Sequence, residues 1–183
     1  MAGKYVMLTG KDRLQESGGR YEEGALKMEY IRRATIKDVS RIAEILVFTK
    51  RMNYRRIFHN DKVSFGEIQV YPLVQDMLNN PEKLRNIWVY DDEFVKGMIY
   101  VDGERIQELY VDFFFENQGI GGKLLDFACR RKGCRSLWVL EKNESAIRFY
   151  ERHHFRLTGE KQLEKGTGEY IVKMENNIFW NNG

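Results

Sequence analysis

The 183-residue sequence is poor in cysteine and proline, with two residues of each. Two cysteines cannot build the disulfide framework of a small secreted protein. Cys129 and Cys134 would point to different faces of one helix, so we expect buried thiols and neither a zinc site nor a local disulfide. No apolar run reaches the roughly 18 residues that a membrane helix needs. We therefore predict a cytoplasmic protein that does not interact with membranes.

The net charge of the chain is small, and histidine is rare. The net charge of +3 is too small to indicate a nucleic-acid partner. The three histidines have no carboxylates at ligand spacing, so no metal site is expected. A Gly-x-Ser-x-Gly motif is missing, which argues against a serine hydrolase of that type. The hydrophobic fraction of 43% and the length favour one ordinary globular domain.

The two ends of the chain differ from its middle. Residues 1–27 are polar, punctuated by glycine and without a clear period, so we predict a dispensable N-terminal extension. The alternative is that Tyr5–Leu8 forms a strand that docks on the domain or on a second subunit. The main domain is expected over residues 28–175. Residues 176–183 form a polar tail to which we assign no function.

Hydrophobic periodicity predicts an alternation of strands and helices in this domain. Thr35 is the expected N-cap of the first helix, with Asp38 three residues later. Asp91-Asp92 and Asp102-Gly103 are turn signals that make the middle of the chain an antiparallel meander. Strands are expected over 28–34, 86–90, 94–101, 105–112, 135–140, 155–163 and 169–174, and helices over 36–50, 70–78, 119–132 and 143–153.

A glycine-bearing turn joins the expected strand 105–112 to the helix 119–132. The turn contains Gly119, Gly121 and Gly122, which have no side chains to keep a ligand away from the first amides of the helix. These amides and the positive end of the helix dipole form an anion site. A P-loop is excluded because Gly122-Lys123 is followed by Leu124 instead of serine or threonine. A Rossmann fingerprint is excluded because Leu124 also occupies the position of its third glycine. A glycine-rich helix start without a ligand remains the alternative.

Two stretches resemble motifs of the GNAT superfamily of N-acetyltransferases. Val111–Leu125 resembles its acyl-CoA-binding motif, in which a strand runs into Arg/Gln-x-x-Gly-x-Gly/Ala. Gly119-Ile120-Gly121 matches the glycines, and Glu116 takes the place of the arginine or glutamine. Asn143–Phe155 is similar to the later motif Asn-x-x-Ala-x-x-Phe-Tyr-Glu-x-x-Gly-Phe, with His154 in place of the glycine. The resemblance covers about residues 29–174.

The resemblance implies an α/β fold with a mixed, mostly antiparallel central sheet flanked by helices. Two parallel strands of this sheet would splay apart at the cofactor site. It also implies direct transfer of an acetyl group from acetyl-CoA to a primary amine of a small molecule or peptide, in a ternary complex. Many members of the family pair, so a homodimer is an alternative to a monomer.

The resemblance also assigns site residues. The tyrosine at Tyr150 would protonate the departing CoA thiolate, the alternative being a core aromatic. The helix-and-loop region 51–65 would cover the acceptor, with Arg55 or Arg56 available to hold an acidic group, the alternative being a solvated helix face. The expected contacts of acetyl-CoA are the strand backbone at Leu109, Tyr110 and Val111, the turn residues Asn117, Gln118, Gly119, Ile120, Gly121, Gly122 and Lys123, and Asn143, Ala146 and Phe149 of the second motif.

The acceptor amine must lose a proton before it attacks, because an alkylamine has a pKa of about 10.4. Glu108 and Glu141 are the two candidate bases, each of which could instead be a solvated strand carboxylate, and His59 is a weaker candidate. The competing class is a non-catalytic acyl-CoA sensor in which Glu116 and His154 mark a decayed site. A nucleotide-binding protein of another family would bind ATP or NAD instead.

Overall fold

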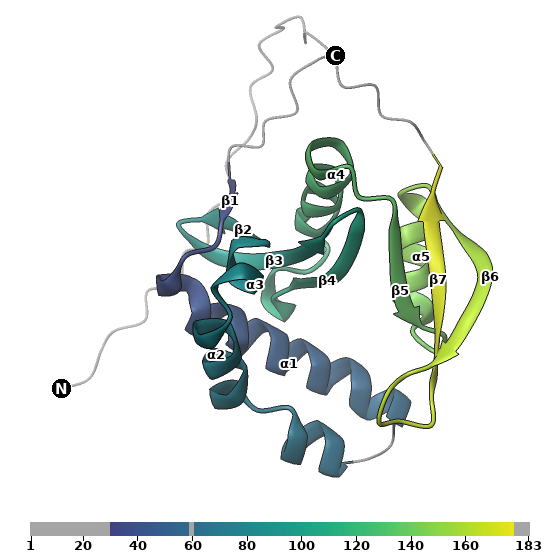
Figure 1. Cartoon of the computed structure of the whole chain (residues 1–183), viewed down its shortest axis with the longest axis horizontal. Coiled ribbons are helices and arrows are strands. Elements are labelled where there is room, and N and C mark those ends of the chain that lie inside the picture. Colours follow the sequence, from purple (N-terminus) through teal and green to yellow (C-terminus); the bar gives the residue numbers. More distant parts are fainter. Residues whose placement is uncertain (1–29, 59–60, 178–183) are drawn as a thin grey trace, which may run out of the picture.

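The computed structural model describes residues 30–58 and 61–177, which build one sheet with helices on both of its faces (Figure 1). The expected strand Tyr5–Leu8, His59 and the end of the tail lie outside the described residues. The strands are β1 (Ile31–Arg33), β2 (Ile87–Asp92), β3 (Phe94–Asp102), β4 (Arg105–Val111), β5 (Ser136–Leu140), β6 (Phe155–Leu163) and β7 (Tyr170–Asn176). The helices are α1 (Val39–Phe58), α2 (Val70–Asn79), α3 (Pro81–Arg85), α4 (Ile120–Lys132) and α5 (Glu144–Arg152), with shorter turns η1 (Ile36–Asp38), η2 (Lys62–Glu67) and η3 (Phe113–Phe115).

The seven strands lie in the order β1-β2-β3-β4-β5-β7-β6. Only β4 and β5 are parallel, as expected for two strands joined through α4, and all other neighbours are antiparallel. The parallel ladder is short, because it joins only Arg105 to Ser136 and Ile106 to Leu137. Beyond these pairs β4 and β5 diverge (Figure 1). The predicted mixed sheet with splayed parallel strands is confirmed.

A β-bulge in β4 lies where the strands begin to diverge. Val101 of β3 pairs with Ile106, whereas Tyr100 pairs with Glu108, so Gln107 is an extra residue in β4. Such a bulge bends a strand and shifts the alternation of its side chains. Ile106 and Leu109 consequently both contact the core under α4 and α5. The bulge therefore sets which side chains of β4 face each layer.

Two hydrophobic clusters hold the helices to the sheet. One lies under α4 and α5 and contains Leu124, Leu137 and Phe155, which are at most 1% exposed. The other lies under α1 and α2 and contains Ile42 and Met98, both fully buried. Burying a side chain of this kind contributes roughly 1.5–3 kcal/mol to folding. The sheet between these layers is the rigid element that positions the site.

Two of the expected boundaries were wrong. The first helix does not end near Lys50 but continues to Phe58, because Ile57 extends its buried stripe and Arg51 bonds to backbone oxygens of the following segment. The first hairpin turns at Glu93, in the left-handed region, while both aspartates before it still pair with β3. A short helix that was not predicted, α3, begins at Pro81, where a missing amide proton costs little.

Both cysteines are buried, as predicted. Burial raises the pKa of Cys129 and of Cys134 to about 12, so both remain protonated thiols near neutral pH. Within the described part of the chain, no helix has the length and apolarity of a membrane span.

The expected cap at Thr35 is formed and includes an arginine. The Asp38 carboxylate accepts bonds from the Thr35 amide at 2.7 Å and from its hydroxyl at 2.8 Å. The guanidinium group of Arg32 in β1 donates a bidentate pair of hydrogen bonds to the two oxygens of this carboxylate, each at 2.8 Å. The hydrogen bond from Arg32 is the main reason that the pKa of Asp38 is lowered to about 2. The carboxylate thus joins the first strand to the start of α1.

Replacing Asp38 with asparagine is expected to lower the free energy of unfolding by about 1–2 kcal/mol at pH 7, with allowance for the half-exposed Arg32. Because the folded pKa lies below the ordinary value of 3.8, the stabilisation is present above pH 3.8 and is lost as the pH falls toward 2. Urea unfolding should therefore show the difference between wild type and Asp38→Asn shrink over that interval. The control Glu44→Gln removes an exposed ion pair and should change stability little. A constant difference between pH 7 and pH 2 would contradict this account.

Candidate functional site

The predicted anion site lies at the first turn of α4. Gly119 precedes the helix with φ 77°, a left-handed conformation that glycine adopts at little cost. The first helical bond runs from the Lys123 amide to the Gly119 carbonyl, at 3.1 Å. The amides of Ile120, Gly121 and Gly122 come before this bond and have no acceptor within the helix. They form a bare cradle for an anion at the end of the gap between β4 and β5.

Two glycines of this cradle lie against side chains of neighbouring elements. A Cβ atom on Gly121 would lie 3.4 Å from Phe149 of α5 and 3.7 Å from Val111 of β4. A Cβ atom on Gly122 would lie 3.0 Å from the imidazole of His153. The end of β4, the start of α4 and one face of α5 therefore meet at the same point.

His153 lies in the turn that follows α5, next to the cradle. Its half-buried ring stacks on Phe149 with the ring centres 4.8 Å apart, and it faces Gly122. Burial lowers the pKa of His153, against the opposing effect of Asp126, which lies 4.0 Å away. Nothing in the sequence indicated this contact, since it depends on how α5 packs on α4. His154 is the exposed turn residue, with φ 69°.

The second motif folds as α5 and packs against the same core. Asn143 caps the helix: its side-chain oxygen accepts a bond from the Ala146 amide at 3.2 Å. The ring of Tyr150 packs between Phe149 and Phe155, with centroid distances of 5.2 and 5.9 Å. Asn143 therefore has a structural role whether or not it also contacts a ligand. Ala146, Phe149 and Tyr150 all pack, partly buried, against the core under α4 and α5.

The backbone expected to hold the pantetheine arm borders the gap. Leu109, Tyr110 and Val111 pair with β3 on one side, but no residue of β5 pairs with them on the other. Leu109 and Val111 contact the core under α4 and α5, whereas Tyr110 contacts the core under α1. The edge of β4 is therefore open toward β5 along this segment.

The two candidate bases have different surroundings. Glu108 is half-buried on the α1 side of β4, and its carboxylate lies 2.6 Å from the ammonium of Lys50. Glu141 follows β5 and is exposed, with its carboxylate 2.7 Å from Lys161 of β6. Glu108 therefore lies beside the gap, while Glu141 is held by the closing hairpin.

The exposed residues of the glycine turn differ in where they point. Lys123 is directed to Tyr90 of β2, with its ammonium 3.3 Å from the hydroxyl, instead of over the cradle. Glu116 is exposed, although partial burial and then the charge of Asp112 raise its pKa. Asn117 adopts φ 61°, and Gln118 bonds back to the Phe114 carbonyl at 3.4 Å. The carboxylate that replaces the family's arginine or glutamine therefore lies at the exposed rim of the site.

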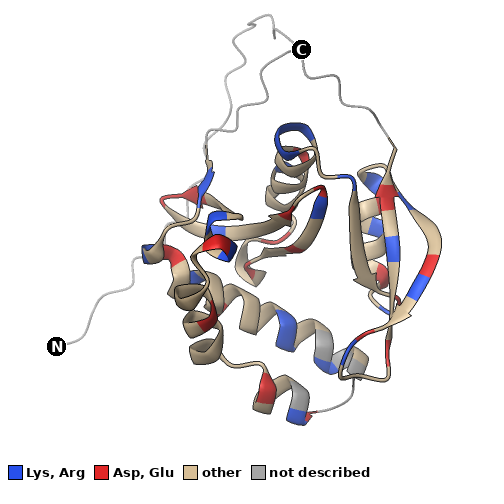
Figure 2. Cartoon of the chain, viewed as in Figure 1, with Lys and Arg blue, Asp and Glu red and all other residues tan. Residues whose placement is uncertain are grey.

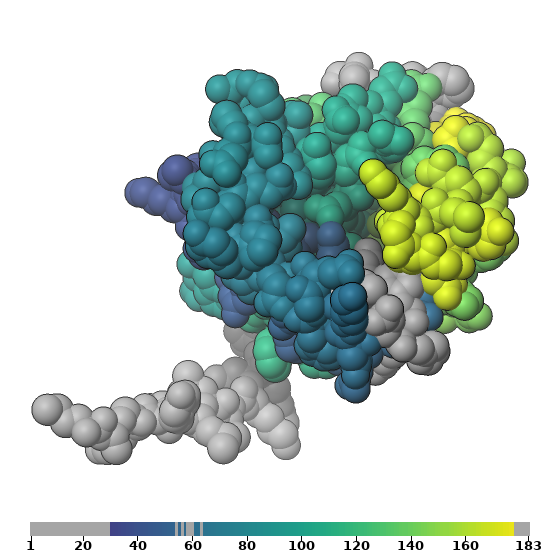
Figure 3. All heavy atoms as spheres, turned by 60° about the horizontal axis from the view of Figure 1, so that its bottom comes forward, coloured from purple at the N-terminus to yellow at the C-terminus, as the bar shows by residue number. Residues whose placement is uncertain are grey.

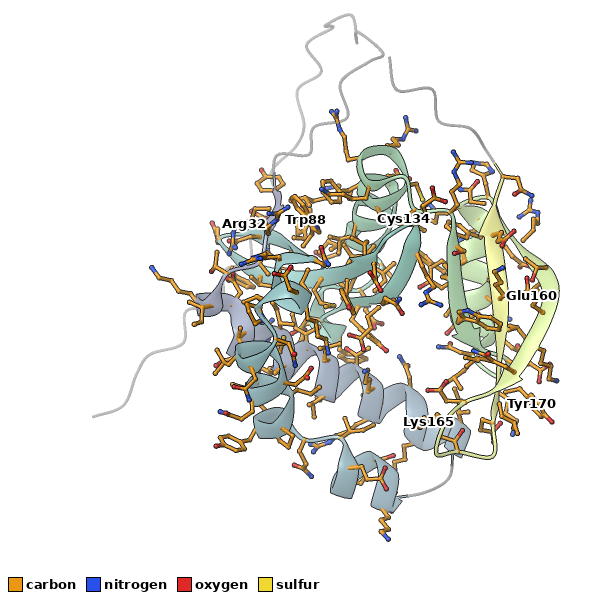
Figure 4. The ribbon with its side chains drawn as sticks, in the orientation of Figure 1. Arg32, Trp88, Cys134, Glu160, Lys165 and Tyr170 are labelled. Atoms are coloured by element: carbon orange, nitrogen blue, oxygen red, sulfur yellow. The ribbon has the colours of Figure 1, made fainter. Side chains whose placement is uncertain are left out.

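The region expected to cover the acceptor lies on the opposite side of the gap from α5. Figure 3 shows the surface hollowed between the residues of the η2–α2 segment and the yellow residues of the β6–β7 hairpin. Lys165 lies in the connection of this hairpin and Tyr170 where β7 begins (Figure 4). Arg55 is paired with Asp61 at 3.0 Å, whereas the side chain of Arg56 lies outside the described residues.

Cationic side chains elsewhere are spread over several elements (Figure 2). The last turn of α4 carries Arg130, Arg131 and Lys132, which complement the negative end of the helix dipole. Over the described ranges, no cluster of histidine, cysteine and carboxylate side chains could hold a metal ion.

The sequence and the fold were compared with known proteins. Residues 83–157 match the family model described as an acetyltransferase (GNAT) domain. Over 92 residues the chain is 30% identical to the peptidyl-lysine N-acetyltransferase YjaB of Salmonella typhimurium. That match covers 50% of this chain and 62% of YjaB, so it spans less than two thirds of the curated relative.

Solved structures share the fold along most of the chain. The apo form of YjaB from Escherichia coli superposes with a TM-score of 0.60 at 19% identity, covering 81% of this chain and 97% of YjaB. The PaiA N-acetyltransferase of Thermoplasma acidophilum, solved with coenzyme A, has a TM-score of 0.56 at 18% identity, covering 79% and 97% of the two chains. YncA of Salmonella typhimurium, solved with acetyl-CoA, has a TM-score of 0.55 at 17% identity, covering 84% and 95%.

These identities are low enough that the structural likeness concerns the fold alone. The sheet with its splayed parallel strands and the glycine turn at the end of β4 therefore give a GNAT-like fold. The matching family model and the sequence relative add that residues 83–157 are similar to a GNAT acetyltransferase domain.

Proposed function

We propose that this protein transfers an acetyl group from acetyl-CoA to a primary amine of a small molecule or peptide. The observation that carries the proposal is the bare first turn of α4 at the open end of the β4–β5 gap. A pyrophosphate fits the amides of Ile120, Gly121 and Gly122, and a pantetheine arm fits the edge of β4 where that strand diverges from β5. Bound coenzyme A or acetyl-CoA in PaiA and YncA supports this choice of donor.

Glu108 is the stronger of the two proposed bases. It lies on the part of β4 that borders the gap and is largely shielded from water, with 21% of its side chain exposed. Glu141 is 46% exposed and is paired with the outer hairpin. A base must lie within reach of the reacting amine, directly or through one water, and this requirement favours Glu108. Glu141 and His59 remain alternatives that only substitution can separate.

The remaining steps need a donor for the carbonyl oxygen and an acid for the thiolate. An amide of β4 next to the bulge would stabilise the charge that develops on the carbonyl oxygen, since backbone donors are already fixed in place. Tyr150 is the proposed acid, because α5 packs against the end of β4 at the cradle. In this mechanism the amine attacks the thioester directly, in a ternary complex.

The acceptor is proposed to enter through the hollow between the η2–α2 segment and the β6–β7 hairpin, on the face of β4 that carries Glu108 (Figure 3). The relative YjaB is named a peptidyl-lysine N-acetyltransferase. The first amine to test is therefore the lysine side chain of a peptide. We place acetyl-CoA on the α5 side, so the two substrates would approach the gap from opposite faces of the sheet.

The test is a titration followed by an activity assay. Isothermal titration should show binding of acetyl-CoA, and none of ATP or NAD. Release of free CoA should then depend on an added amine, measured with lysine peptides, a peptide with only an N-terminal amine, and a polyamine. Binding without turnover on any amine would favour the acyl-CoA sensor. Failure to bind acetyl-CoA would contradict the proposal.

A further inference from the structure

Lys50 of α1 places an ammonium group against β4. Its Nζ atom lies 2.6 Å from the Glu108 carboxylate and 5.6 Å from the centre of the Tyr110 ring. Only 18% of its side chain is exposed. A carboxylate and an aromatic face, both partly removed from water, are the groups that hold an alkylammonium ion.

This ammonium group lies beside the part of β4 that borders the gap. Glu108 comes directly after the bulge residue Gln107, and Tyr110 belongs to the segment of β4 that is open toward β5. An acceptor amine would have to lie at this point, within reach of the proposed base and of an acyl group held along β4. Lys50 therefore occupies the position that the proposed function assigns to the acceptor.

We propose that Lys50 is an internal acceptor, which the protein acetylates when no external amine is bound. This inference rests on the proposed function. Glu108 takes a proton from the Lys50 ammonium, and the free amine attacks the thioester carbonyl of acetyl-CoA. The C–N bond forms and the C–S bond breaks, and Tyr150 protonates the departing thiolate of CoA. The nitrogen loses its second proton as it becomes an amide, and this proton restores Tyr150 through solvent. The products are CoA and an uncharged acetyl-lysine.

The modification would change the acceptor site. Acetyl-lysine cannot form an ion pair with Glu108, and its added acetyl group remains next to the carboxylate. An incoming amine would then have to compete with this group for space. An external amine present before the reaction would instead displace the Lys50 ammonium from Glu108 and protect it.

Lys83 of α3 provides a matched comparison within the same chain. Its Nζ atom lies 2.6 Å from Asp76 and 5.8 Å from the Tyr100 ring, and 30% of its side chain is exposed. Tyr100 belongs to β3, so this lysine is one strand further from the gap. Direct chemical acetylation favours the more exposed Lys83, whereas acetylation within the site favours Lys50.

The experiment incubates the full chain with ¹³C-labelled acetyl-CoA in an amine-free buffer. Intact mass should show one acetyl group per chain, and tandem mass spectrometry should place it on Lys50. Because a positioned base contributes roughly 100-fold or more, Lys50 should react about 100-fold faster than Lys83. The rate constant should not depend on protein concentration. Lys50→Arg should remove the label and Lys83→Arg should retain it, while Glu108→Gln should slow the reaction.

Several results would overturn the inference. Equal labelling of Lys50 and Lys83 would indicate chemical acetylation, as would labelling that persists in Gly121→Glu. A rate constant proportional to protein concentration would mean that chains acetylate one another. If the protein acetylates external amines but Lys50 stays unlabelled, Lys50 only forms an ion pair with Glu108. In that case the inference fails and the proposed function stands. If a parallel titration shows no binding of acetyl-CoA, the proposed function itself has failed.

Discussion

Replacing Gly121 with glutamate is expected to weaken acetyl-CoA binding by at least about 100-fold. The new carboxylate would stand where the pyrophosphate is proposed to lie, and two unit charges about 4 Å apart repel by roughly 4 kcal/mol at the effective dielectric constant near a protein surface. Since about 1.4 kcal/mol is a factor of ten in affinity, the loss should exceed the range of an ordinary titration. Isothermal titration of wild type and variant with acetyl-CoA measures it.

Gly121→Ala is the control that separates charge from size. An added Cβ atom would meet Phe149 at 3.4 Å, which is within ordinary van der Waals contact, and the backbone there is not left-handed. The alanine variant should therefore fold and bind acetyl-CoA with a modest loss of affinity. Circular dichroism of both variants shows that the fold is retained. Binding by Gly121→Glu as tight as that of wild type would place the ligand elsewhere.

Replacing Tyr150 with phenylalanine is expected to lower kcat about 100-fold, because a positioned general acid contributes roughly that much or more. The variant keeps the ring that packs between Phe149 and Phe155, so thermal stability and the affinity for acetyl-CoA should change little. Steady-state kinetics with the best amine of the panel would show a fall in kcat and a nearly constant KM for acetyl-CoA.

Tyr30→Phe is the matched control for this substitution. Tyr30 lies just before the edge strand β1, away from the gap, and is 41% exposed, so the loss of its hydroxyl should leave kcat unchanged. A Tyr150→Phe enzyme with wild-type kcat would mean that Tyr150 is a core aromatic and that water protonates the thiolate. A variant that loses stability and kcat together would indicate that its hydroxyl has a structural role.

Local chemistry explains why much of the fold and the cradle could be predicted. Gly119 takes a positive φ and opens a helix because glycine has no Cβ atom, and Asn143 caps α5 through a bond to an amide three residues later. These interactions lie within a few residues of one another, so they leave a pattern in the sequence. Both motifs consequently formed the expected elements in the expected places.

Register and long-range pairs account for what could not be predicted. Nothing about Gln107 in the sequence marks it as a bulge residue. It is one only because its neighbours Ile106 and Glu108 pair with consecutive residues of β3. The contact between His153 and Gly122 depends on how two helices pack. Similarly, nothing distinguished Glu108 from Glu141 until their partners Lys50 and Lys161 were known.

The sequence by itself determined the order of the main strands and helices, the glycine turn at the start of α4 and the two GNAT-like motifs, because each depends on local residue patterns. Only the tertiary structure decided where β4 parts from β5, and that an ammonium group lies against Glu108. Lys50 and Glu108 are 58 residues apart in the chain. They meet because α1 packs across β4, and no local pattern encodes that contact.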